Sequence, residues 1–142
     1  MDERFDWTAI ARSCLGRYWA QETPAKQKEF VSLFSDFLER TYLDKFETYY
    51  NDLDRIDYLG ERIVDGYASV KVVVRTKEQI NHPVEYRLSK SSKDNAWQIY
   101  DVLIEGISLV QNYRDQLSAI LSQSSFEGLI KDLKAKLGKD TQ

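Results

Sequence analysis

The 142-residue chain has the length of one domain, and its 42% hydrophobic content is ordinary for a globular protein. Its 20 basic and 23 acidic residues give a formal charge of −3 and are well mixed, which argues against a nucleic-acid-binding arm or a polybasic membrane patch. No run reaches the ~20 apolar residues of a membrane span. We therefore expect a single domain over residues 1–142, with no nucleic-acid partner and no stable membrane insertion.

The first third of the chain predicts two helices. Apolar residues recur at three- and four-residue spacing between Phe5 and Trp19, which predicts the first helix. Thr23 and Pro24 have the residue types of an N-cap and a first helical position, so the second helix begins there. Its apolar stripe consists of Phe30, Leu33, Phe34, Phe37, Leu38, Thr41 and Tyr42, and continues less regularly through Phe46, Tyr49 and Tyr50.

From about Ile56 the apolar period changes to two, which predicts strands. Asp65-Gly66 lies between two extended runs and predicts a hairpin with positive φ at both turn positions. Asn81-His82-Pro83 predicts a second turn, and the polar stretch from Ser91 to Asn95 predicts a third. A fourth strand from Trp97 to about Ile104 completes an antiparallel meander of four strands.

Beyond the fourth strand the period returns to 3.6 and predicts two more helices. Ser108 with Gln111, and Ser124 with Glu127, have the pattern of capping boxes, and Gly138 can end the last helix. The order helix, helix, four strands, helix, helix predicts an α+β fold. In this fold the N- and C-terminal helices pack on one face of the sheet.

Few residues could carry catalysis. His82 is the single histidine and Cys14 the single cysteine, and we expect the first exposed in a turn and the second buried, so neither a Cys/His dyad nor a metal site is expected. Asp101 and Glu105 lie among apolar residues where the fourth strand ends. A carboxylate in such a run is on the outer face or buried with a partner. A charge pair, or a cap on nearby backbone amides, is favoured over a paired acid/base site.

The segment from Trp97 to Arg114 reads WQIYDVLIEGISLVQNYR. It resembles the strand-to-helix signature of the MlaC family, also called the toluene-tolerance family: a Trp, an aliphatic-Tyr-Asp, an aliphatic run ending in Glu-Gly, an aliphatic-Ser and an Asn-Tyr-Arg. The stretches Leu15-Gly16-Arg17-Tyr18-Trp19, Thr23-Pro24 and Phe126-Glu127-Gly128-Leu129 are also similar to the family. The resemblance extends from about Phe5 to Leu137.

The resemblance implies a periplasmic, non-enzymatic phospholipid carrier of a Gram-negative envelope, with an apolar cavity between sheet and helices. It implies phospholipid as cargo and no cofactor. It also implies two partners, an inner-membrane ABC-transporter complex and an outer-membrane lipoprotein complex, and a role in outer-membrane lipid asymmetry. Family members usually carry a signal peptide and a further helical stretch before the position of Phe5, and we expect this lipid-carrier domain to lack both.

Strand parity and helix periodicity select the residues expected to line the cavity. From the strands these are Val70, Val72, Val74, Val84, Tyr86, Leu88, Trp97 and Ile99. From the helices they are Phe34, Phe37, Leu38, Tyr42, Val110, Tyr113, Leu117 and Ile120. Tyr42, Tyr86 and Tyr113 suit a cavity mouth, because each has an apolar ring and a polar tip.

Two other functions remain open from the residues alone. A small isomerase- or dehydratase-like enzyme would need an acid/base group in its pocket, and Asp101 and Tyr86 are the candidates. An interaction domain would have the same elements around a filled core.

Overall fold

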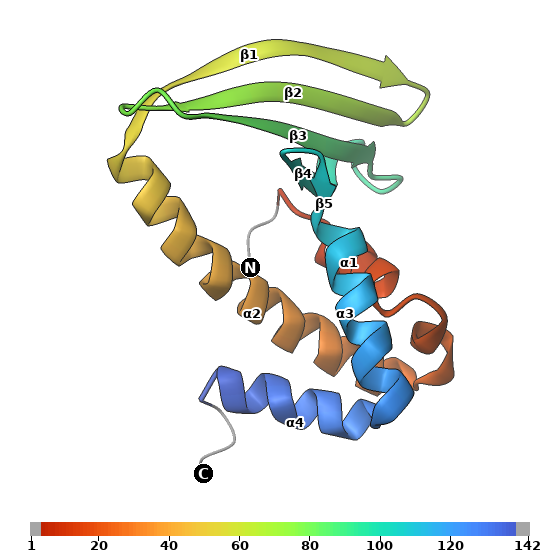
Figure 1. Cartoon of the computed structure of the whole chain (residues 1–142). Coiled ribbons are helices and arrows are strands. Elements are labelled where there is room, and N and C mark those ends of the chain that lie inside the picture. Colours follow the sequence, from red (N-terminus) through yellow and green to blue (C-terminus); the bar gives the residue numbers. More distant parts are fainter. Residues whose placement is uncertain (1–3, 139–142) are drawn as a thin grey trace.

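The computed structural model describes residues 4–138, and within the second helix it describes only the backbone of residues 43–50. The helical elements are α1 (Trp7–Leu15), the 3₁₀ helix η1 (Gly16–Gln21), α2 (Pro24–Asn51), α3 (Leu109–Gln123) and α4 (Phe126–Lys136). The strands are β1 (Leu53–Val64), β2 (Tyr67–Thr76), β3 (Asn81–Lys90), β4 (Trp97–Ile104) and β5 (Ile107–Ser108). The curved sheet forms one layer, and every described helix lies on the same side of it (Figure 1). The predicted α+β fold is confirmed in this respect.

The sheet is an antiparallel meander in the order β1-β2-β3-β4-β5. It has five strands instead of the four predicted, because Ile107 and Ser108 turn back to pair with Ile104 and Leu103. A two-residue strand is too short to give a periodic signal in the sequence. Phe5 adds a parallel bridge to Ile99, so the start of the described chain is also fastened to β4.

The first helix is shorter than predicted. α1 ends at Leu15 and the chain continues as η1, so a single helix from Phe5 to Trp19 is wrong. Gly16 has φ 56°, in the left-handed region that favours glycine, and this conformation stops the α-helix. At the other end the Asp6 carboxylate accepts a hydrogen bond from the Ala9 amide and caps the helix.

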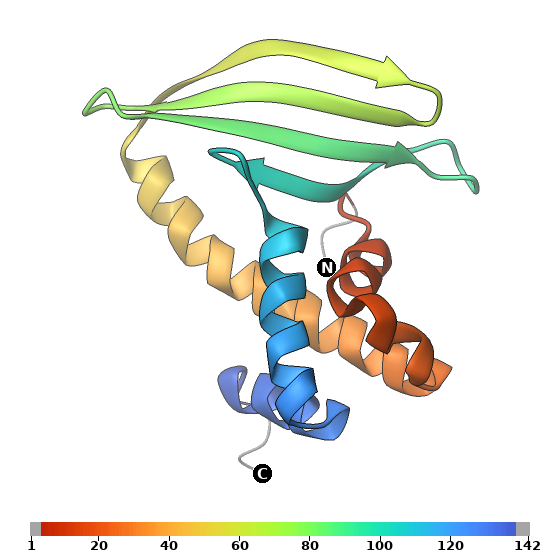
Figure 2. The same cartoon turned by 45° about the vertical axis from the view of Figure 1, so that its right-hand side comes forward.

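The start of α2 is as predicted, with Pro24 at its first position and Thr23 Oγ1 accepting from the Lys26 amide at 3.3 Å. Figures 1 and 2 show that α2 runs diagonally below the sheet and leads at its C-terminal end into β1. The predicted stripe residues Phe46, Tyr49 and Tyr50 lie outside the described side chains.

Two predicted turns are corrected. The Asp65-Gly66 hairpin is confirmed, but only Asp65 has positive φ, at 55°, which is the pattern of a turn that needs a positive φ at its first central position alone. His82 and Pro83 lie within β3, paired with Val74 and Val73, and not in a turn. Pro83 is tolerated close to the start of the strand, where its carbonyl accepts from the Glu105 amide.

The hydrophobic core is built by the helices. Every fully buried member of the main cluster that the structure describes comes from α1, α2, α3, α4 or the residue after α4. Phe30 and Phe34 stack at its centre with ring centroids 5.0 Å apart, and Phe126 packs on Phe30. α1 and α3 reach the sheet mainly at β4 (Figure 2), so the helical layer and the wider part of the sheet are largely separate.

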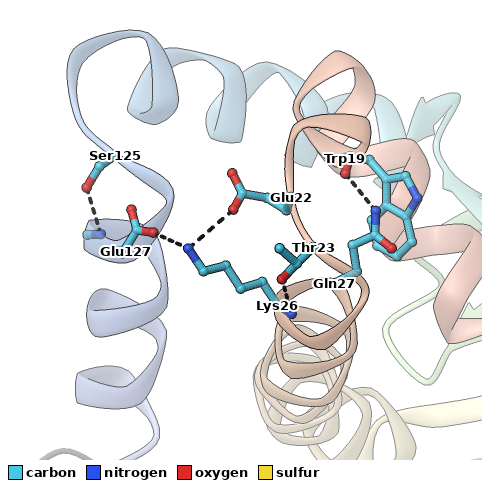
Figure 3. A network of polar contacts seen from close by, with 8 residues as sticks. Trp19, Glu22, Thr23, Lys26, Gln27, Ser125 and Glu127 are labelled. Carbon is cyan, nitrogen blue, oxygen red and sulfur yellow. Dashed lines mark hydrogen bonds and ion pairs between the residues drawn. The ribbon is translucent and has the colours of Figure 1, made fainter.

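Polar contacts at the start of α2 join it to η1 and α4 (Figure 3). Lys26 Nζ lies 2.7 Å from Glu127 and 3.9 Å from Glu22, and Gln27 donates to the Trp19 carbonyl at 2.8 Å. The Lys26–Glu127 pair is exposed, so it stabilises little and mainly fixes which helix ends meet.

The cap of α4 differs by one residue from the prediction. Ser125, not Ser124, accepts the hydrogen bond from the Gly128 amide (Figure 3). A Cβ on Gly128 would lie 2.8 Å from Ser124 Oγ, so glycine allows the two serines to crowd this turn. The other predicted cap is confirmed, since Ser108 Oγ accepts from the Gln111 amide at 3.0 Å.

Candidate functional site

The sheet presents one strongly apolar face, which we call the inner face. Residues directly opposite each other in an antiparallel sheet share a face, and the register places Tyr58, Val72, Val84 and Ile104 in one row across four strands. The inner face has the apolar residues Ile56, Tyr58, Ile63, Ala68, Val70, Val72, Val74, Val84, Tyr86, Leu88, Trp97, Ile99, Val102 and Ile104. It contains all eight strand residues selected from the sequence.

The inner face is turned toward the helices. Phe5 pairs with Ile99 and so shares its face, and Phe5 packs against the helical core. The inner-face residues of β2 and β3 are half-buried, whereas Lys71 and Arg87 on the opposite face are exposed. This agrees with the position of the helices below the concave side of the sheet (Figure 1).

The inner face is incompletely covered. None of the eight predicted strand residues is fully buried. On the edge strand β1, Ile56, Tyr58 and Ile63 are 56%, 61% and 57% exposed. A contiguous exposed apolar area of this kind marks a binding surface more often than an ordinary surface.

The opposite, outer face of the sheet is charged. Asp57 on β1 accepts from both Arg55 and Arg75, and the hydrogen bonds from Arg75 and then Arg55 lower the pKa of that carboxyl. On β3, Arg87 donates to Glu85 at 2.9 Å and lowers the pKa of Glu85. The two faces therefore differ in chemistry, and only the inner face suits an apolar ligand.

The helix residues selected from the sequence divide into two groups. Phe34, Leu38, Val110 and Leu117 are fully buried members of the helical core, so the structure places them in packing between helices and not at the open inner face. Phe37, Tyr42 and Tyr113 are partly buried against that core, and Ile120 is exposed. The half-buried group is the one with surface left for a ligand.

Two tyrosines form a polar pair at this boundary. Burial raises the pKa of Tyr42, and the charge and hydrogen bond of neighbouring Tyr113 raise it further. The Tyr113 ring stands edge-on to Phe34 and Phe37, with centroids 5.6 and 6.1 Å away. On the facing sheet, burial also raises the pKa of Tyr86. The raised pKa values keep the phenols of Tyr42 and Tyr86 neutral at physiological pH, so these two residues add polarity without charge.

The candidate catalytic groups have structural roles. Asp101 is buried and accepts from the Val102 and Val110 amides at 2.8 and 3.0 Å and from the Ser108 hydroxyl. The expected cap on backbone amides is thus confirmed, and it holds the start of α3 against β4. Burial, then the charge of Asp101, raises the pKa of the Cys14 thiol to about 12, so the thiolate nucleophile is suppressed.

His82 and Glu105 form a separate exposed pair, with His82 Nδ1 2.9 Å from Glu105 Oε1. Within the described residues no group of three or more His, Cys, Asp or Glu side chains is arranged to hold a metal ion. None of the helices in the described part of the chain combines the length and apolar character needed to cross a membrane.

A comparison with protein families adds a decisive observation. The family described as "MlaC protein" matches residues 1–135. The chain belongs to the MlaC family. This agrees with the resemblance of the segment from Trp97 to Arg114, which forms β4, β5 and the first part of α3.

Two known proteins illustrate the likeness. The intermembrane phospholipid transport system binding protein MlaC of Haemophilus influenzae is 20% identical over 117 residues, which cover 82% of this chain and 55% of that protein. The chain thus spans about half the length of this relative. The structure of a phospholipid-binding protein from Ralstonia solanacearum, in complex with a phospholipid, superposes with a TM-score of 0.80 and 27% identity, covering 93% of this chain and 73% of that one.

Sequence reasoning missed the part of the inner face that lies on β1. Alternation counted from Ile56 and Tyr58 would put even-numbered residues on the inner face all along β1. Leu59 is an extra residue with no partner on β2, so it forms a bulge. Beyond the bulge the odd-numbered residues face inward, and Ile63 therefore lies on the inner face. Gly60 was the available signal, since a glycine within a strand often marks a bulge.

Proposed function

We propose that this MlaC-family chain binds a phospholipid with its acyl chains against the inner face of the sheet and its head group in water. The observation that carries the proposal is the contiguous apolar inner face, which spans β1 to β4 and is left half-buried. The lining comprises the eight predicted strand residues together with Phe37, Tyr42 and Tyr113. Phe34, Leu38, Val110 and Leu117 act behind it, in the core that supports the helical wall.

The chemistry of the face fits acyl chains. Each CH₂ group removed from water contributes ~0.8 kcal/mol, so two chains are held strongly by a nonspecific apolar wall. Three polar side chains of the inner face lie at its margins: Glu61 on the edge strand, His82 near the start of β3 and Lys90 at the end of β3. A carrier must also release its cargo, and a wall without a central charged clamp favours exchange.

We further propose that the protein is a periplasmic shuttle. It would exchange phospholipid with an inner-membrane ABC-transporter complex and an outer-membrane lipoprotein complex and so maintain outer-membrane lipid asymmetry. The name of the Haemophilus influenzae relative, an intermembrane phospholipid transport system binding protein, supports this proposal, as does the phospholipid bound to the Ralstonia solanacearum protein. Phospholipid is the cargo in this scheme, and no cofactor or catalytic step is required.

The alternatives have less support. An enzyme would need Asp101 or Tyr86 as an acid/base group, yet Asp101 is committed to the cap of α3 and the Tyr86 pKa is raised. A filled-core interaction domain would bury the inner face of the sheet, which is instead half-buried.

Mass spectrometry of the purified protein tests the proposal, under non-denaturing conditions and again after organic extraction. We expect added mass that is recovered as phospholipid. Val72→Trp is expected to reduce uptake of a fluorescent phospholipid while the fold survives, because Val72 lies half-buried on the incompletely covered inner face. Lys71→Trp is the matched control on the outer face. Uptake that is equal in the two variants, or absent in the wild type, would refute the proposal.

A further inference from the structure

β1 is a long, open sheet edge. It has twelve residues, and its described pairing is with β2 alone. Leu59 is 59% exposed, in addition to the exposed apolar residues of the inner face. An unpaired edge of this length is a template for a further strand.

The sequence of β1 is complementary to itself under a two-fold axis between Leu59 and Gly60. An antiparallel second copy then places Ile56 opposite Ile63, and Asp57 opposite Arg62. The first pair lies on the inner face and the second on the outer face, so each residue meets one of the same face. Each pair occurs twice because the interface is symmetric.

Other registers of the β1–β1 pairing are less favourable. A shift of one residue would set inner-face residues against outer-face residues. A shift of two residues can oppose Arg55 to Arg62, which repel each other. The bulge at Leu59 is compatible with the register that pairs Ile56 with Ile63, because the bulges of the two copies then meet at the two-fold axis. There is room for them there, since no described atom lies within 4 Å of the Cβ position of Gly60.

We infer that β1 pairs edge to edge with β1 of a second copy, which gives one continuous antiparallel sheet. Two Asp57–Arg62 ion pairs and two Ile56–Ile63 contacts specify the register. The pairing brings the inner faces of the two copies side by side and covers part of the exposed apolar surface of β1. It does not depend on the ligand, so it holds or fails independently of the proposed function.

The backbone of β1 offers a specific test position. A two-residue turn is closed by a hydrogen-bonded pair, here Val64 and Tyr67, and such pairs alternate along the ladder. Glu61 and Ile63 therefore direct their amides away from β2. Glu61→Pro removes one outward amide at an edge position where proline is tolerated.

Analytical ultracentrifugation from about 1 µM to about 500 µM tests the pairing, since a small interface of this kind associates weakly. We expect the mass to rise from one chain to two. Arg62→Glu places like charges opposite Asp57 twice and should weaken the dimer about 10-fold or more. Lys71→Glu, an equal charge change on the outer face of β2, is the control and should leave it unchanged.

Glu61→Pro should also weaken the dimer while circular dichroism shows a retained fold, and Arg62→Glu decides the question if the proline variant does not fold. A single-chain mass at every concentration would overturn the inference. Equal weakening by Arg62→Glu and Lys71→Glu would do the same, because it would place the contact elsewhere.

Discussion

Arg114 of α3 donates from Nε to the main-chain carbonyl of Ser13 at 2.7 Å and so fastens α3 to the C-terminal end of α1. Its side chain passes 3.9 Å from the position that a Cβ on Gly16 would occupy, at the point where α1 gives way to η1. A cation at a helix C-terminus satisfies carbonyls that the helix leaves unpaired. The final residue of the family signature thus links helices that are distant in sequence.

Replacement of Arg114 tests this link. We expect Arg114→Gln to lower the free energy of unfolding by ~1–2 kcal/mol, since a hydrogen bond from a charged donor is lost. Arg114→Lys should recover part of the loss through its charge. Urea denaturation measures both variants. If lipid uptake fell while stability stayed at the wild-type value, Arg114 would have a ligand-binding role instead.

The buried carboxylate of Asp101 gives a second prediction. Asp101→Ala leaves two amides and a hydroxyl without their acceptor, so we expect a loss of ~2–4 kcal/mol in the free energy of unfolding. Asp115→Asn, which changes an exposed carboxylate on α3, should stay within about 0.5 kcal/mol. Similar losses in the two variants would contradict the role of Asp101 as the buried acceptor that holds the start of α3 against β4.

The raised pKa of the Cys14 thiol predicts that the free energy of unfolding depends on pH. Its pKa is raised to about 12 in the folded protein, above the usual value of about 8.5, so only the unfolded chain ionises in the interval between them. The stability due to the buried thiol is complete below about pH 8.5 and is lost as pH rises toward 12, by up to ~1.4 kcal/mol per unit.

The control for this effect is Cys14→Ala, which has no thiol to titrate. The difference in unfolding free energy between wild type and Cys14→Ala should shrink from pH 8.5 upward, as measured by urea denaturation at each pH. A constant difference would show that the Cys14 pKa is not raised. The folded wild type should also resist thiol reagents at pH 8.

A matched pair of isoleucines tests the division between filled core and open sheet. Ile10 is fully buried in the helical core, whereas Ile56 lies exposed on the inner face. Ile10→Ala should cost ~2–5 kcal/mol, and Ile56→Ala less than about 1 kcal/mol. Lipid uptake should fall in Ile56→Ala. Equal losses of stability would mean that the sheet and the helices share one core.

The sequence predicted the fold class and the inner residues of β2 and β3 because alternation is reliable where pairing has no bulge. Val70, Val72 and Val84 illustrate this, since each lies on the inner face as expected. The alternation of inner and outer residues could not be followed past Leu59, because the extra residue of the bulge exchanges the two faces for the rest of β1. The positive φ of Gly16 likewise divided a stretch whose apolar period alone predicts one helix.

The helix residues show a different limit. Periodicity identifies the apolar side of a helix but not the element that this side meets. Phe34 and Leu38 are inward as predicted, yet they contact other helices and not an open space. The difference is set by how closely α2, α3 and α4 approach one another, which depends on the whole chain.

The separate helical core has a mechanical consequence. Its described members all come from the helical part of the chain, so the free energy that holds the helices together is insensitive to the curvature of the strands. Bending of β1, β2 and β3 relative to the helices would therefore leave the buried residues of this cluster in contact with one another. For the proposed phospholipid carrier, the sheet would thus adjust to acyl chains of different bulk while β4, the strand that α1 and α3 contact, stays in place.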